Sequence, residues 1–212
     1  CDFIFDCSVF QHLIIGKHFK AEWKSYEKDL VCNSAIAFFL PQTNPTIQNE
    51  KTWTQGIAMK YGWVWGAPLK HRWGCGYVYS DKYVDADTVL KEAEEYYGQK
   101  LEVVKHFKFK TGTYKKVWIK NCVAVGLSGS FIEPLEASSI GATIEQVKCL
   151  ASSLVCWSRE DQFIERKYNK IFDKGNYLTS IYFKYIESPI TNVIYPKEND
   201  SLVLINNFAN GA

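Results

Sequence analysis

The sequence CVAVGLSGSFIEPLEASSI, residues 122–140, decides the expected fold because it predicts a strand, a loop and a helix start in succession. Its opening run, residues 122–126, is apolar and typical of a buried strand. A segment rich in glycine and serine follows, and a helical pattern begins near its end. The backbone N–H groups of a first helical turn have no partner within the helix and favour anions. This order of elements is therefore typical of an anion-binding pocket.

Three polar residues at the expected helix start each allow two interpretations. Ser138 and Ser139 either offer backbone amides to a small anion or cap the helix, which is the more common role of serine there. Glu136 either stabilises the helix start through its charge or faces a ligand and transfers a proton. Glu133, in the same loop, is the competing acid. The residues alone leave these alternatives open.

Composition and charge limit the classes of function. The 212 residues are 47% hydrophobic and 16% aromatic, which indicates a globular protein. A net charge of +2 is too small to indicate a nucleic-acid or membrane partner. Seven cysteines, with no CxxC pair, favour reduced thiols of the core, so we expect a cytoplasmic protein. The four histidines do not cluster with them in sequence, so no metal site is expected.

The order of elements favours the α+β class, with strands early in the chain and helices late. Residues 85–97 form the clearest helix, with acids at its start and Gly98 after its end. We expect a sheet-rich part over residues 1–141 and a mainly helical, substrate-side part over residues 142–212. The other expected strands are residues 1–7, 34–40, 54–69, 71–80, 106–110 and 115–126. The other expected helices are residues 144–155 and 159–186, the latter interrupted near Gly175.

Trp63 and Trp65 lie two residues apart, so on a strand they share one face of the sheet. Two indoles on one face form a large rigid wall. In isolation, the more common explanation is an ordinary hydrophobic core. A wall beside an aromatic ligand is the alternative.

Together these motifs resemble the flavin-dependent tryptophan halogenases, in the same order and over roughly residues 2–183. WVWGAP, residues 63–68, is similar to the W-x-W-x-I-P signature of that family, and FIEPLEASSI, residues 131–140, to its F-x-EPLESTGI. The resemblance implies part of a flavin monooxygenase-like, FAD/NAD(P)-binding fold with a mixed or antiparallel sheet and a helical substrate module. The other matching segments are residues 2–10, 74–80, 111–128 and 168–173.

The resemblance implies an oxidoreductase that uses FADH2 and O2 to oxidise chloride or bromide to hypohalous acid. The acid then halogenates a separate aromatic substrate of the tryptophan or indole type, and a separate flavin reductase supplies FADH2. Glu136 falls on the catalytic glutamate of the family, and Ser138 and Ser139 on its halide-binding pair. Leu127 and Ile140 fall on flavin-contacting positions. Trp63, Trp65 and Pro68 fall on the wall of the tunnel between flavin and substrate.

Several residues depart from the family pattern. Ala137 and Ser139 replace a serine and a glycine beside the expected halide site, Ala67 replaces an isoleucine, and Val9 replaces a glycine. These departures suggest a looser indole or phenol specificity. The chain has neither a G-x-G-x-x-G dinucleotide fingerprint nor a lysine that matches the catalytic one. We therefore expect part of a longer polypeptide, inactive alone. A homo-oligomer is compatible with the sequence.

Two alternatives remain from the sequence. The first is an oxygenating flavin monooxygenase of related fold, which typically carries Gly-Asp where this chain has Gly126 and Leu127. The second is a non-catalytic, halogenase-like remnant in which Glu136, Trp63 and Trp65 are structural.

Overall fold

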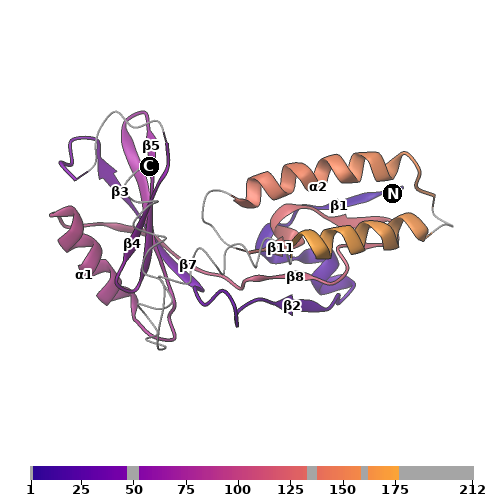
Figure 1. The fold of residues 1–212 in the computed structure, drawn as a ribbon, viewed down its shortest axis with the longest axis horizontal. Coiled ribbons are helices and arrows are strands. Elements are labelled where there is room, and N and C mark those ends of the chain that lie inside the picture. Colours follow the sequence, from indigo (N-terminus) through magenta and orange to yellow (C-terminus); the bar gives the residue numbers. More distant parts are fainter. Residues whose placement is uncertain (1, 47–52, 133–137, 159–161, 177–212) are drawn as a thin grey trace, which may run out of the picture. The chain divides into compact units, whose positions relative to one another are not determined.

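The computed structural model describes residues 2–46, 53–132, 138–158 and 162–176. Its contacts group the chain into two compact units (Figure 1), Cys1–Leu30 with Lys110–Phe183, and Val31–Phe109 with Lys184–Ala212. The boundary expected between residues 141 and 142 falls inside helix α2 (Ser138–Leu154), so this grouping follows a different division. The mixture of sheets and helices confirms the expected α+β class.

The first unit contains two small sheets. In one, β1 (Ile4–Asp6) pairs in parallel with β10 (Cys122–Ala124), which pairs antiparallel with β9 (Trp118–Ile119). The other is antiparallel and has the order β11 (Ser130–Phe131), β8 (Gly112–Tyr114) and β2 (Trp23–Ser25).

The single strand expected over residues 115–126 is wrong. The chain turns at Lys120, which adopts a left-handed φ of 55°, and so makes the hairpin β9–β10 instead.

Helical segments surround these sheets. A short 3₁₀ turn, η1 (Val9–Gln11), and a six-residue π-helix, η2 (Leu13–His18), follow β1, and the 3₁₀ turn η3 (Gly126–Ser128) follows β10. Helix α2 and a helix over residues 163–176 follow later in the chain (Figure 1). An aromatic cluster fills the core: the fully buried Trp118 has the rings of Phe3 and Tyr168 each 5.3 Å from its own.

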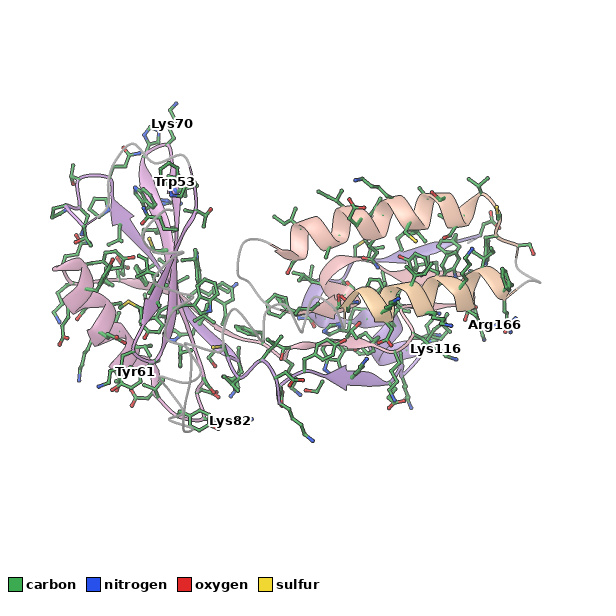
Figure 2. All side chains as sticks on the ribbon, viewed as in Figure 1. Trp53, Tyr61, Lys70, Lys82, Lys116 and Arg166 are labelled. Carbon is green, nitrogen blue, oxygen red and sulfur yellow. The ribbon has the colours of Figure 1, made fainter. Side chains whose placement is uncertain are left out.

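The second unit is one five-stranded antiparallel sheet. Its order is β4 (Gln55–Met59), β5 (Gly62–Leu69), β6 (Arg72–Tyr79), β3 (Ser34–Pro41) and β7 (Val103–Lys108). The single strand expected over residues 54–69 is wrong, because the chain reverses at Lys60 and Tyr61. The N–H of Tyr61, a residue labelled in Figure 2, donates to the Tyr77 hydroxyl, which helps to fix this turn.

Helix α1 (Ala86–Tyr97) covers one face of this sheet. Asp85 caps its start by accepting from the Thr88 N–H at 2.8 Å, and Gly98 ends it with a left-handed φ of 64°, as the sequence predicts. Val89 and Ala93 are fully buried against strand residues such as Ile36 and Phe38, which together form the core of the unit.

Some expectations about burial are corrected. Phe107, on the edge strand β7, is 40% exposed. Cys32, Cys75 and Cys122 are buried free thiols as predicted, whereas Cys7 and Cys156 are free but exposed. Among the described residues, no helix is long and apolar enough to cross a membrane.

Candidate functional site

The site begins where strand β10 ends. Gly126 has a left-handed φ of 62°, and a Cβ added to it would lie 3.1 Å from the Thr143 hydroxyl oxygen. Glycine suits both the conformation and the close approach of helix α2. Leu127, the next residue, is half-buried in the turn η3. The turn is further tied to β1, because the Val125 N–H donates to the Asp6 carbonyl at 3.0 Å.

A cavity of about 370 Å³ lies between α2 and the helix over residues 163–176. Its floor includes Gly126 and Gln146, and the rings of Tyr168 and Phe172, stacked 6.3 Å apart, contribute to its wall. The other described lining residues are Ser130, Ile132, Ser139, Gly141, Ala142, Thr143, Glu145, Cys149, Ile171, Gly175 and Asn176.

The expected site residues differ in where they lie relative to the cavity. Ser139 lines the cavity, and its carbonyl accepts from the Thr143 hydroxyl at 2.7 Å. Ile140 is 65% exposed and is not among the described lining residues. Ser138 is the first residue of α2. Glu136 and Glu133, together with Ala137, lie outside the described residues.

Buried amide side chains hold the surrounding backbone, and Asn169 is the clearest case on the second helix. Its Oδ1 accepts from the N–H groups of Val117 and Trp118 at 2.9 and 3.0 Å, and its Nδ2 donates to the Trp118 carbonyl at 2.8 Å. This contact joins the helix to strand β9. It gives a physical reason for the asparagine in the segment YNKIFD.

The loop after β1 contributes a histidine that the sequence did not single out. His12 has a left-handed φ of 47°, and its Nδ1 lies 3.1 Å from the Ser128 carbonyl, so Nδ1 carries the proton. The ring is flanked by Trp23 and Tyr114. Val9, in the same loop, has a φ of 55°, which is strained for a β-branched residue.

The carboxylate of Asp6 organises this loop. It is buried and accepts from the N–H groups of Ser8, Ile14 and Ile15, and from the Ser8 hydroxyl at 2.5 Å. Burial by itself would raise the pKa of Asp6, but these hydrogen bonds lower it below its ordinary value. In the cavity, burial raises the pKa of the Tyr168 phenol, which stays neutral.

The two tryptophans share one face of the second unit's sheet, as predicted. Their ring centroids are 6.2 Å apart, and the Trp65 ring lies directly over Gly76 of the neighbouring strand. Trp63 is buried, and its indole N–H has no hydrogen-bond partner among the described residues. Pro68 is half-buried near the end of β5.

No group of three or more metal-ligating side chains gathers within the described parts of the chain. The described residues instead form a cavity beside a helix start, a tightly held turn and, in the other unit, an aromatic sheet face. A strand and a turn followed by a helix that packs against the turn can present the backbone amides of the helix start to an anion.

Comparison with known proteins identifies the family. The sequence profile described as "Tryptophan halogenase" matches residues 1–177, so the chain belongs to the tryptophan halogenase family. The tryptophan 6-halogenase ThaL of Streptomyces albogriseolus is 35% identical over 141 residues, which are 66% of this chain and 26% of ThaL. The tryptophan 7-halogenase KtzQ of Kutzneria sp. is 32% identical over the same share of each chain.

Solved structures agree with this assignment. BrvH, a flavin-dependent halogenase from Brevundimonas sp. BAL3, superposes with a TM-score of 0.75 at 28% identity, over 86% of this chain and 37% of that chain. The expected fold, part of a flavin-binding halogenase fold, is confirmed. The chain spans about a quarter of the length of the curated relatives, 26% for both ThaL and KtzQ.

Proposed function

We propose that this chain is part of a flavin-dependent halogenase that uses FADH2, O2 and halide to halogenate a small aromatic substrate. The observation that carries the proposal is the succession of β10, the turn at Gly126 and the start of α2, within the region that the family profile matches. This succession brings the candidate halide residue Ser139 to a cavity.

The halide binds to the backbone amides of Ser138 and Ser139. A halide ion has no directional bonding, so N–H donors and the positive end of a helix dipole suit it whatever the side chains are. The two serines, in place of threonine and glycine, therefore keep the donors.

The flavin contacts Leu127 and Ile140. An exposed isoleucine offers apolar surface that a planar ring can cover, and Ile144 and Val147, on the same side of α2, are exposed as well. When bound, FADH2 with O2 supplies the oxidation of halide to hypohalous acid. The residues of this chain supply position and electrostatics.

Glu136 acts on the aromatic substrate. A carboxylate there orients the electrophile or accepts the proton that leaves the ring carbon. Trp63, Trp65 and Pro68 form the wall that separates substrate from flavin. The packing of Trp65 against Gly76 supports a rigid wall.

The substrate belongs to the tryptophan or indole class, with chloride or bromide as the halide. A separate reductase delivers FADH2 in the cytoplasm, and the 212 residues are inactive by themselves.

The role of Glu136 is tested with a matched pair of variants in the polypeptide as the organism makes it. Glu136→Gln should lower the rate of indole bromination at least about 100-fold, the scale of general acid–base catalysis. Glu133→Gln is the control and should retain most of the rate. Both rates are measured by mass spectrometry with FADH2 supplied by a reductase. If Glu136→Gln retains most of the rate, as Glu133→Gln should, Glu136 does not have this role.

A further inference from the structure

The side chain of Gln146 joins helix α2 to the last residue of β10 and to the first residue of the turn that follows it. Its Oε1 accepts from the Gly126 N–H at 2.8 Å, and its Nε2 donates to the Ala124 carbonyl at 2.8 Å. The residue is 6% exposed and its side chain lines the cavity. Only this orientation of the amide satisfies both backbone groups, because the N–H needs an acceptor and the carbonyl a donor.

Thr143, one turn earlier on α2, extends this connection toward the helix start. Its side chain packs beside Gly126 and its hydroxyl donates to the Ser139 carbonyl at 2.7 Å. One face of α2 therefore contacts the turn at Gly126 and the backbone of Ser139 together. The contacts fix the distance between these two backbone segments.

We propose that Gln146 is a positioning residue that holds the turn at Gly126–Ser128 in register with the first turn of α2. The inference rests on the proposed function, in which Leu127 contacts the flavin and Ser138 and Ser139 bind the halide. The distance between flavin and halide then depends on a side chain that touches neither. A shift of about 1 Å in such an arrangement is enough to lower a rate about 100-fold.

This role requires a neutral amide at position 146, because the side chain must accept from the Gly126 N–H and donate to the Ala124 carbonyl. Leucine at this position can do neither. An ionised glutamate accepts from Gly126 but places a negative oxygen against the Ala124 carbonyl, whereas a protonated glutamate restores both bonds. The titratable groups that line the same cavity are Glu145, Cys149 and Tyr168, and the Tyr168 hydroxyl lies 3.5 Å from the backbone carbonyl oxygen of Gln146. Tyr168 stays neutral because burial raises its pKa.

The test uses the polypeptide as the organism makes it, bromide as the probe, and amide NMR of Gly126 and Ser139. In Gln146→Leu, the Gly126 amide should exchange with solvent at least about 10-fold faster, since it loses its buried acceptor. The bromide-dependent shift of the Ser139 amide should need at least about 10-fold more bromide. Ser152→Ala, at an exposed position of α2 that is not among the described residues lining the cavity, is the control and should change neither quantity.

Gln146→Glu separates positioning from general damage to the fold. At about pH 8 the Gly126 amide keeps its acceptor and should exchange as in the wild type, while the repulsion between the carboxylate and the Ala124 carbonyl should weaken bromide affinity as Gln146→Leu does. Toward about pH 5 the wild-type bromide affinity should return, as the buried carboxyl takes up a proton and donates to Ala124. Wild-type exchange and affinity in all variants would overturn the inference, as would the absence of recovery in folded Gln146→Glu. If wild-type Ser139 does not respond to bromide, the halide site is refuted instead, and the exchange of Gly126 still decides the role of Gln146.

Discussion

Gly76 keeps the Trp65 ring flat on the sheet, and replacing it with alanine tests this packing. A Cβ at Gly76 would lie 1.9, 2.2 and 2.5 Å from three carbons of the Trp65 ring. Gly74, two residues earlier on the same face of β6, is the natural control. A Cβ there meets only Leu69 Cδ1, at 3.4 Å.

The size of the effect follows from these distances. Carbon atoms pack at about 3.5–4.0 Å, so the ring must retreat by roughly 1.5 Å or leave the sheet. A tryptophan buries about 150–250 Å², so losing half of that area costs about 2–3 kcal/mol at about 25 cal/mol per Å². Retaining the ring in a strained position costs about 1–3 kcal/mol. Gly76→Ala should therefore lose about 2–3 kcal/mol, and Gly74→Ala less than about 0.5 kcal/mol.

The assay is urea unfolding followed by circular dichroism and tryptophan fluorescence. Trp65→Leu removes the ring, so in a double-mutant cycle the cost of Gly76→Ala should fall by about 1–2 kcal/mol in the Trp65→Leu background. If Gly76→Ala and Gly74→Ala have the same stability, the packing of Trp65 on β6 is not as described. An unchanged cost in the Trp65→Leu background would contradict it equally.

Two further predictions concern the first unit. Asp6→Ala leaves three backbone N–H groups without their acceptor, and should cost roughly 3–5 kcal/mol in urea unfolding. Because the folded pKa of Asp6 is lowered, its contribution is complete above the ordinary value of about 3.9 and is lost as the pH falls through the lowered pKa. Asp6→Asn should therefore flatten the acid limb of a stability–pH curve, and an unchanged slope would exclude Asp6 as its source. Asn169→Ala should cost about 2–4 kcal/mol, since the buried N–H groups of Val117 and Trp118 lose their acceptor, whereas a loss below about 0.5 kcal/mol would show that this clamp is dispensable.

Local patterns predicted much of the fold. The caps at Asp85 and Gly98 mark helix α1 in the sequence as they do in the structure, because capping depends on neighbouring residues alone. The alternation of Trp63 and Trp65 also places both on one face, since a strand repeats every two residues. Both hairpins within apolar runs were missed. The turn at Lys60–Tyr61 contains no glycine, asparagine or proline, which normally indicate a reversal. The turn at Lys120–Asn121 does carry this signal in Asn121, and the apolar run around it hid the reversal.

The candidate site was predictable only where it depends on short segments. The turn at Gly126 and the start of α2 follow from a strand, a glycine and a helical pattern along one stretch. The partners of Gln146, Asn169 and His12 lie 20 or more residues away along the chain, so no local pattern indicates them. The one available signal is that Gln146 shares a helix face with the buried Leu150. The roles of Glu136, Ser138 and Ser139 stay predictions.

The central claim is halogenation, and bromide tests it most directly because bromine has two isotopes of nearly equal abundance. The polypeptide as the organism makes it is supplied with a flavin reductase, FAD, O2, bromide and either indole or tryptophan. The account predicts a product whose mass spectrum shows the bromine doublet, and which disappears when bromide or flavin is omitted. A hydroxylated product without bromine would contradict the account and indicate an oxygenating monooxygenase. Unchanged substrate, with flavin oxidation confirmed, would contradict the proposed substrate class.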